Sequence, residues 1–326
     1  MKLRNRLASV FLLTSVLGFA GAAQADTYPS RPIKMIVGYA PGGSVDTFAR
    51  LIAPELGKEL GQTVVVENLA GAGGTIGVTR AVTSRPDGYT ILMGIVSDVV
   101  IAPLVQSSVR YNYQDLRAVA ALGTSGLGVV ANPKLGINSF ADLIRLAKER
   151  PGELTYGATG AGSLPAIAME SFKKITNTDI TFIPYSSASR IATDVIGGSI
   201  DLAVSGLPAL LEFIKSGRLS AVGVMSHERD IGNPDIPAAG DSPELKGMDY
   251  YFWTGIFGPA EMPDDIVKKI NIAFNRAMAN PEIHERFKSM GVKSNATMTP
   301  EEFSNFVANS SSQWQKAIEE AGVERQ

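Results

Sequence analysis

The 326-residue sequence contains no cysteine, only two histidines and no excess of basic residues. Without cysteine the chain forms no disulfide, no thiolate metal site and no cysteine nucleophile. The formal net charge of −2 provides no basic surplus to hold phosphates, so we expect no nucleic-acid partner. His227 lies in a polar stretch and His284 in a charged helical pattern, which is typical of solvated histidines. No cluster of metal ligands is visible, and the sequence predicts no metal site.

Long apolar runs are also missing, except near the N-terminus. There, three basic residues within the first six precede "LASVFLLTSVLGFAGAA", and "AQA" ends at Ala25. A basic start, a short apolar stretch and an A-x-A site predict a secretory signal peptide at residues 1–25. A transmembrane helix needs about 20 apolar residues, and this run is interrupted by threonine, serine and glycine. Because no cysteine follows to carry a lipid, we expect a periplasmic protein that begins at Asp26 and has no lipid anchor.

The remaining chain alternates between short β-branched runs and helical patterns. Apolar residues at 44–60 recur with a period near 3.6 until Gly61, and residues 138–150 form a second capped helical pattern. Such strand–helix alternation predicts an α/β fold with mostly parallel sheets covered by helices on both faces. The length favours two lobes over one. The expected strands start near residues 33, 63, 90, 127, 180, 200 and 221.

Glycine-rich turns follow three of the expected strands. In "YAPGGSVD", Gly42 and Gly43 precede a helix that we expect Ser44 to cap. Unpaired backbone N–H groups at a helix N-terminus carry partial positive charge, and glycine lets an anion approach them. A tight turn alone explains Ser44 and Asp46 but not two adjacent glycines. Similar turns occur at 68–78 and 156–166, so the sequence predicts an anion site at the carboxyl ends of parallel strands.

The motifs of nucleotide-binding proteins and hydrolases are absent. Gly157 to Gly162 has the Walker spacing, but Ser163-Leu164 follows where Lys-Ser/Thr is required. The glycines at 71, 73 and 77 miss the dinucleotide fingerprint by one residue. There is no G-x-S-x-G and no visible pair of base and nucleophile. The residues therefore indicate a two-lobed binding protein without cofactor, rather than an enzyme.

Blocks spread along the whole mature chain resemble the Bug receptors, the substrate-binding components of tripartite tricarboxylate transporters. The blocks stand in the family's order and spacing. They are "YPSRPIKMIVGYAPGGSVDTFARL", "LGQTVVVENLAGAGGTIG", "PDGYTIL", "INSFADLIRLAKERPGELTYGATGAGS", "PYSSASRIATDVIGGSIDLAVSGLPALLEFIKSGRL" and "WTGIFGPAEMPDDIVKKIN".

This resemblance implies a two-lobed periplasmic binding protein of the type II-like class, with its ligand cleft between the lobes. Lobe 1 would take residues 26–122 and 248–326, and lobe 2 residues 123–247. The ligand would be a small carboxylate, such as a di- or tricarboxylate, an amino acid or an aromatic acid. The protein would act as a monomer and deliver the ligand to an integral-membrane permease. Two alternatives stay open: a sensor that acts on a sensor-kinase ectodomain of a two-component system, and a periplasmic lyase or hydrolase.

The resemblance also implies the binding residues. In the family, two loops hold one ligand carboxylate mainly through backbone amides and waters. By position these residues are Tyr39, Ala40, Pro41, Gly42, Gly43, Ser44 and Asp46 in lobe 1, and Thr159, Gly160, Ala161, Gly162 and Ser163 in lobe 2.

Some positions depart from the family pattern and are our candidates for specificity. We expect the far half of the ligand to meet Ser97, Asp98, Ser187 and Ser205. Asp98 would disfavour a second carboxylate nearby and favour an amine or a hydroxyl. The alternative for Asp98 is a solvated loop residue.

Overall fold

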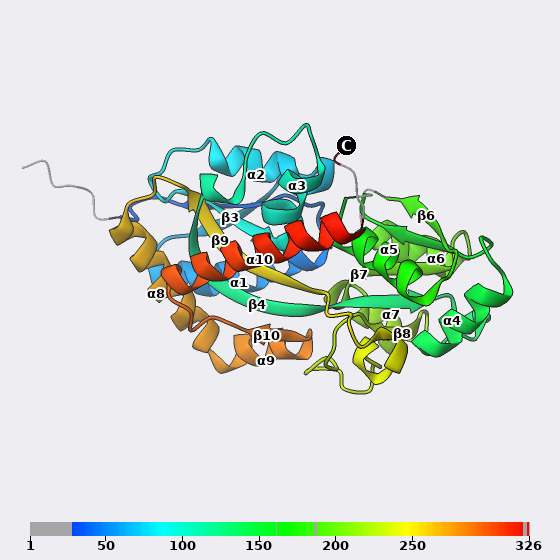
Figure 1. Cartoon of the computed structure of the whole chain (residues 1–326). Coiled ribbons are helices and arrows are strands. Elements are labelled where there is room, and N and C mark those ends of the chain that lie inside the picture. Colours follow the sequence, from blue (N-terminus) through cyan, green and yellow to red (C-terminus); the bar gives the residue numbers. More distant parts are fainter. Residues whose placement is uncertain (1–27, 161, 186–187, 322–324, 326) are drawn as a thin grey trace, which may run out of the picture.

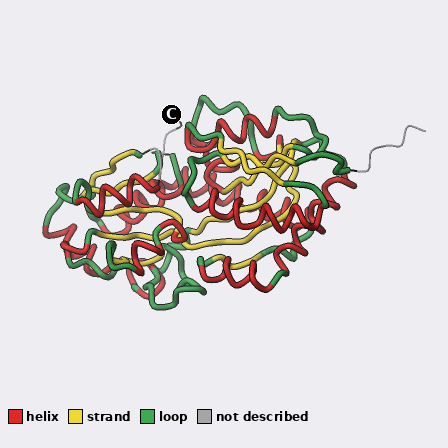
Figure 2. The backbone as a smooth tube through the Cα atoms, turned by 180° about the vertical axis from the view of Figure 1, so that it is seen from behind, coloured by secondary structure: helices red, strands yellow, loops and turns green. Residues whose placement is uncertain are grey.

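The computed structural model describes residues 28–160, 162–185, 188–321 and 325 (Figure 1). The expected signal peptide at residues 1–25 lies outside this part of the chain, as do two candidate site residues, Ala161 and Ser187. The described residues form an elongated molecule with two groups of strands and helices along one long axis (Figures 1 and 2). This confirms the expected two-lobed α/β fold.

The strands of the described part form one mixed sheet in the order β2-β1-β3-β9-β4-β7-β5-β6, and β8 and β10 also pair with β4. Their bounds are β1 (Ile33–Val37), β2 (Val64–Asn68), β3 (Thr90–Ile95), β4 (Leu116–Ala131), β5 (Thr155–Ala158), β6 (Thr181–Pro184), β7 (Leu202–Gly206), β8 (Ser220–Val224), β9 (Tyr251–Pro259) and β10 (Val292–Ser294).

Helices cover the sheet on both sides, and a π-helical turn, η2 (Ser97–Ile101), follows β3. The α-helices are α1 (Ser44–Leu60), α2 (Thr75–Val82), α3 (Ala102–Val105), α4 (Phe140–Glu149), α5 (Leu164–Thr176), α6 (Ala188–Gly197), α7 (Leu211–Lys215), α8 (Asp264–Ala279), α9 (Pro281–Ser289) and α10 (Pro300–Ala321). No helix in the described ranges combines the length and the apolar character needed to cross a membrane.

The expectation of parallel sheets holds at the two ends of the molecule. In lobe 1, β1 pairs with β2 and β3 in parallel, and in lobe 2, β5 pairs with β6 and β7 in parallel. The pairs made by β4 and β9 are antiparallel instead. The chain leaves lobe 1 along β4 and returns along β9, so these two strands run in opposite directions.

Strand β4 belongs to both lobes. Its residues 116–126 pair with β9, and its last five residues, Leu127–Ala131, pair with β7. In Figure 1 it runs along the length of the molecule beneath α10, which contacts both β4 and α5. The proposed lobe boundary between residues 122 and 123 therefore falls inside a continuous strand.

Apolar burial explains how the helices of lobe 1 are held. Phe48, Ile52 and Leu56 of α1 pack in one core cluster with Ile270 and Phe274 of α8. The opposite face of the sheet packs against α2, η2 and α10 in a second cluster. Each fully buried side chain of this size contributes about 1.5–3 kcal/mol, so the strand ends that carry the loops of lobe 1 rest on a rigid support.

Helix α1 begins and ends at the residues that the sequence predicted, Ser44 and Leu60, and Gly61 closes it with φ 70°. The expectation that Ser44 caps this helix is wrong. Gly43 is the N-cap residue, and no side chain caps the first turn. The backbone N–H groups at this helix start are therefore left for another partner.

Candidate functional site

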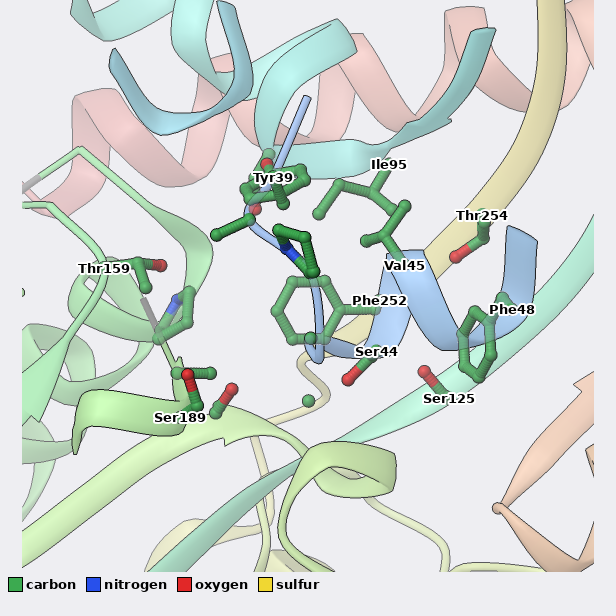
Figure 3. Close-up of a pocket in the computed structure, with 18 residues that line it drawn as sticks. Tyr39, Ser44, Val45, Phe48, Ile95, Ser125, Thr159, Ser189, Phe252 and Thr254 are labelled. Atoms are coloured by element: carbon green, nitrogen blue, oxygen red, sulfur yellow. The ribbon is translucent and has the colours of Figure 1, made fainter. Parts of the chain in front are cut away.

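A cavity of about 80 Å³ lies between the lobes, at the carboxyl ends of β1, β3, β5 and β7 (Figure 3). This is where ligands bind in open parallel sheets. Since a water needs about 10–15 Å³ of such volume, the cavity holds roughly five to eight waters or one small organic molecule. The lining residues are Tyr39, Ala40, Pro41, Gly43, Ser44, Val45, Phe48, Ile95, Ser97, Ser125, Thr159, Pro165, Ala188, Ser189, Ser205, Gly206, Phe252 and Thr254.

None of these lining side chains is charged, but many carry a hydroxyl group. Figure 3 shows Ser44, Ser125 and Thr254 on one side of the cavity and Thr159 and Ser189 on the other. Aromatic and aliphatic groups fill the space between them, with Phe252 in the middle of the view. A ligand charge in this cavity would be met by backbone N–H groups and hydroxyls, and not by a lysine or arginine.

The loop between β1 and α1 brings the start of α1 to the cavity. Gly43, Ser44 and Val45 line it, and the described residues offer no side-chain cap to this helix start. Position 42 requires glycine, because its φ of 88° is unfavourable for a residue with a side chain. Gly43 has an ordinary φ of −82°. A Cβ added to Gly43 would have only the Ala40 carbonyl oxygen within 4 Å, at 3.8 Å. The fold therefore does not require glycine at 43, which leaves the approach to the backbone as a reason for it.

Asp46 holds this loop from behind. Its carboxylate accepts hydrogen bonds from the Gly42 N–H at 3.0 Å, Arg50 Nε at 3.0 Å and Asn68 Nδ2 at 2.9 Å. Asn68 Nδ2 also donates to the Tyr39 carbonyl oxygen at 3.0 Å. Desolvation raises the pKa of Asp46, but the hydrogen bonds from Arg50, Gly42 and Asn68 outweigh it and hold the pKa below its usual value. Neither Asp46 nor Gly42 lines the cavity.

The loop between β5 and α5 supplies the other side. Thr159 lines the cavity, and Pro165 of α5 joins it. Gly160 has φ 81°, and Ser163 Oγ donates to its carbonyl oxygen at 2.8 Å. A Cβ added to Gly162 would lie 2.5 Å from Val105 Cγ2, so this glycine is needed for packing against α3. Of the predicted residues in this loop that the structure describes, Thr159 reaches the cavity and Gly160, Gly162 and Ser163 do not.

The end of β3 carries Ser97 and Asp98 in the π-helical turn η2. Ser97 lines the cavity, whereas Asp98 is fully buried behind it. The alternative of a solvated Asp98 is therefore wrong. Asp98 Oδ1 accepts a hydrogen bond from the Ile95 N–H at 2.9 Å. Burial raises the pKa of Asp98 to about 7, although the hydrogen bond from the Ile95 N–H and the nearby Tyr39 hydroxyl lower it in part. Tyr39, which lines the cavity, donates its hydroxyl to the Gly73 carbonyl oxygen at 3.0 Å.

Other lining residues were not among the predicted binding residues. Ser125 lies on β4, and Phe252 and Thr254 lie on β9. These strands connect the lobes, and no glycine-rich turn marks them. Ser205, which the sequence did predict, lies at the end of β7 and is 8% exposed.

Two α/β lobes with a small uncharged cavity between them have the architecture of a periplasmic solute-binding protein. The comparisons with known proteins agree. The chain belongs to the tripartite tricarboxylate transporter family of receptors, whose family model matches residues 48–323. This family consists of solute-binding receptors, so the expectation of a binding protein rather than an enzyme is confirmed.

Individual relatives cover nearly the whole chain. The protein is 34% identical over 327 residues to protein BugT of Bordetella pertussis, with 99% of each chain covered. Among solved structures, the periplasmic binding protein BugD superposes with a TM-score of 0.86 at 28% identity, covering 92% of this chain and all of BugD. MatC from Rhodopseudomonas palustris, solved with malate, has a TM-score of 0.82 at 26% identity and covers 89% of this chain and all of its own. The resemblance to Bug receptors is thereby confirmed.

Proposed function

We propose that the protein is a periplasmic receptor that captures a small carboxylate between its lobes and delivers it to a membrane permease. The observation that carries this proposal is the uncapped start of α1 at a cavity with no charged lining side chain. The relative MatC was solved with malate, and an R. palustris protein with a TM-score of 0.85 and 25% identity was solved with adipate. The permease partner follows from the family, and export to the periplasm from the expected signal peptide at 1–25.

The energetics allow binding without a cationic side chain. Desolvating a carboxylate costs several kcal/mol in a real protein. Each hydrogen bond to a charged group returns about 1.5–3 kcal/mol. Two or three N–H groups from Gly43, Ser44 and Val45, together with hydroxyls such as that of Thr159, are enough to offset the cost. Since these donors come from both lobes, the ligand is held fully only when the lobes are closed around it.

The binding step divides between the lobes in this proposal. Lobe 1 supplies Tyr39 to Pro41, Gly43 and Ser44, and lobe 2 supplies Thr159 and Ser205. Gly42 and Asp46 hold the first loop in shape, while Gly160, Gly162 and Ser163 shape the second. Closure of the two lobes would be the change that the permease detects.

Thermal unfolding in the presence of small carboxylates tests the function. The panel pairs each acid with its amide, which has the same shape without the charge. A ligand at about 100 times its dissociation constant adds about 2.7 kcal/mol of stability, and for a chain of this size the melting temperature rises by several degrees. We expect at least one acid to raise it and its amide not to. Equal shifts by an acid and its amide, or shifts by neutral compounds alone, would contradict carboxylate capture.

A further inference from the structure

Two buried polar atoms at the end of β3 have no hydrogen-bond partner among the described residues: Ser97 Oγ and Asp98 Oδ2. Ser97 lines the cavity and is only 7% exposed, and its Oγ is itself buried at the cavity wall. Buried polar groups in folded proteins are nearly always paired, because an unpaired one costs free energy. An unpaired hydroxyl in the wall of a binding cavity therefore points to a partner on the ligand.

Asp98 lies directly behind this wall. Its Oδ1 accepts a hydrogen bond from the Ile95 N–H, and the backbone carbonyl oxygen of Asp98 accepts one from the Tyr111 hydroxyl at 2.6 Å. It also lies close to Tyr39: a Cβ added to Gly74 would be 2.9 Å from both Asp98 Cβ and Tyr39 Oη. Asp98 makes no ion pair within the described ranges, and the titratable groups that influence it are Tyr39 and Tyr111. Among the described residues no cationic side chain pairs with Asp98, and the backbone N–H groups around it compensate a negative charge only in part.

A second carboxylate on the ligand would be poorly placed at this end of the cavity. The lining offers it no cation, and Asp98 adds a like charge behind Ser97 whenever it is ionised. Like charges in a poorly solvated region repel strongly. A hydroxyl or a primary amide on the ligand would instead give Ser97 its missing partner without introducing charge.

On the basis of the proposed function, we propose that Ser97 and Asp98 select ligands with one carboxylate and an uncharged hydrogen-bonding group at the far end, and disfavour dicarboxylates. Ser97 would contact the ligand directly, once its buried hydroxyl turns toward the cavity. Asp98 would be a positioning residue that acts through its charge and its contact with Tyr39. The neighbours solved with malate and adipate are holding dicarboxylates, so this selectivity would set the protein apart from them.

Matched ligand sets test the proposal by calorimetry on the purified protein. A four-carbon set is butanoate, 4-hydroxybutanoate, succinamate, succinate and the diamide succinamide. A six-carbon set and a para-substituted benzoate set are built in the same way. In the set that binds best, we expect the hydroxy acid or the monoamide to bind about tenfold or more tightly than the dicarboxylate. A dicarboxylate that binds as tightly as its monoamide overturns the selectivity and leaves the proposed function standing.

The same sets separate this failure from failure of the proposed function. If a diamide binds as well as its monoamide, or if no acid in any set binds, then carboxylate binding at the start of α1 is itself contradicted. The selectivity proposal falls with it in that case. If the acids bind and the diamides do not, the proposed function stands. The ranking of affinities among the acids then decides whether the selectivity proposal holds.

Two variants assign the selectivity to its residues. Ser97→Ala should weaken binding of the hydroxy acid or monoamide about tenfold and leave the unsubstituted acid unchanged. Ser84→Ala, at a half-buried position outside the cavity lining, is the control and should change neither. Equal weakening of every acid by Ser97→Ala would show a structural role and contradict the assignment.

Asp98→Asn keeps the size and the acceptor for Ile95 and removes the charge. In the wild type we expect the preference for monoamide over dicarboxylate to grow from pH 6 to pH 8, since the pKa of Asp98 is about 7. The variant should show a smaller preference that no longer varies with pH, and the exposed Asp265→Asn should behave as the wild type. Thermal melts establish that each variant is folded. An unchanged pH profile in Asp98→Asn overturns the role of Asp98.

Discussion

Asp46 and Asp98 are both buried carboxyl groups next to the same cavity, but their surroundings are opposite. Asp46 is 3% exposed and has partners on both oxygens, including the Arg50 guanidinium. Asp98 is 0% exposed, and among the described residues it has no partner on Oδ2 and no cationic side chain acting on it. The pKa of Asp46 is therefore lowered and the pKa of Asp98 is raised, to about 7. One carboxyl group stabilises a loop, whereas the other costs stability where the ligand is expected.

The largest expected effect is on stability above neutral pH. Because the pKa of Asp98 is higher in the folded protein than its usual value, its contribution is favourable at low pH and is lost as the pH rises from about 4 to about 7. At pH 8 the buried charge remains, so Asp98→Asn should raise the free energy of unfolding by about 2–4 kcal/mol. Denaturant unfolding at pH 5 and pH 8 measures this. A variant that is less stable than the wild type at pH 8 contradicts the unpaired state of Asp98.

Asp46→Ala should have the opposite sign. It removes the acceptor for Gly42, Arg50 and Asn68 and should cost about 1.5–3 kcal/mol at pH 7. Since the pKa of Asp46 is lowered, its contribution is lost only as the pH falls below about 4. Binding of the best acid should weaken roughly hundredfold, because the loop loses its support.

Asp142→Ala is the matched control for Asp46. Asp142 also accepts hydrogen bonds at a helix start, from the Ser139 hydroxyl at 2.8 Å, but it belongs to α4, away from the cavity. The control should lose stability and keep its affinity for the acid. Loss of affinity in both variants would mean that Asp46→Ala weakens binding only by lowering stability, and not by releasing the loop.

A smaller effect is expected from Gly43→Ala, which tests the N–H groups at the start of α1 without disturbing the hydrogen bonds of Asp46. An alanine fits the backbone and has open space around its Cβ, so stability should change by less than about 0.5 kcal/mol. The methyl group would stand in front of the N–H groups at the start of α1, and the affinity for the acid should fall about tenfold. Gly247→Ala, which also has open space around its Cβ, is the control and should bind normally.

The smallest effect on ligand affinity is expected in lobe 2. Ser163→Ala removes the single side-chain hydrogen bond from Ser163 Oγ to the Gly160 carbonyl oxygen and should cost about 0.5–1.5 kcal/mol. Affinity should fall less than in Asp46→Ala, because Ser163 gives this loop one side-chain hydrogen bond, whereas Asp46 gives the other loop a network of them. Equal losses of affinity in Ser163→Ala and Asp46→Ala, measured by calorimetry, would contradict the expected difference between the two loops.

The sequence predicted the loops well and their supports poorly. The glycines after the strands and the helix period at 44–60 are local signals. Residues of the turns at 41–43 and 156–166 line the cavity, but the glycine-rich turn at 68–78 does not reach it. Asp46, by contrast, was expected at the ligand from its position in the family's loop. Its support role depends on Asn68, which lies 22 residues away on β2. Ser125 and Thr254 were missed for a related reason: they reach the cavity only because β4 and β9 pair across the lobes. Such contacts depend on tertiary structure that no local pattern records.

A crystal structure with the acid that stabilises the protein most would test the central claim directly. We predict carboxylate oxygens within hydrogen-bond distance of the Ser44 or Val45 N–H and of the loop at Thr159, with no lysine or arginine in contact. A carboxylate bound to a cationic side chain, or held outside the cavity between the lobes, would contradict the account.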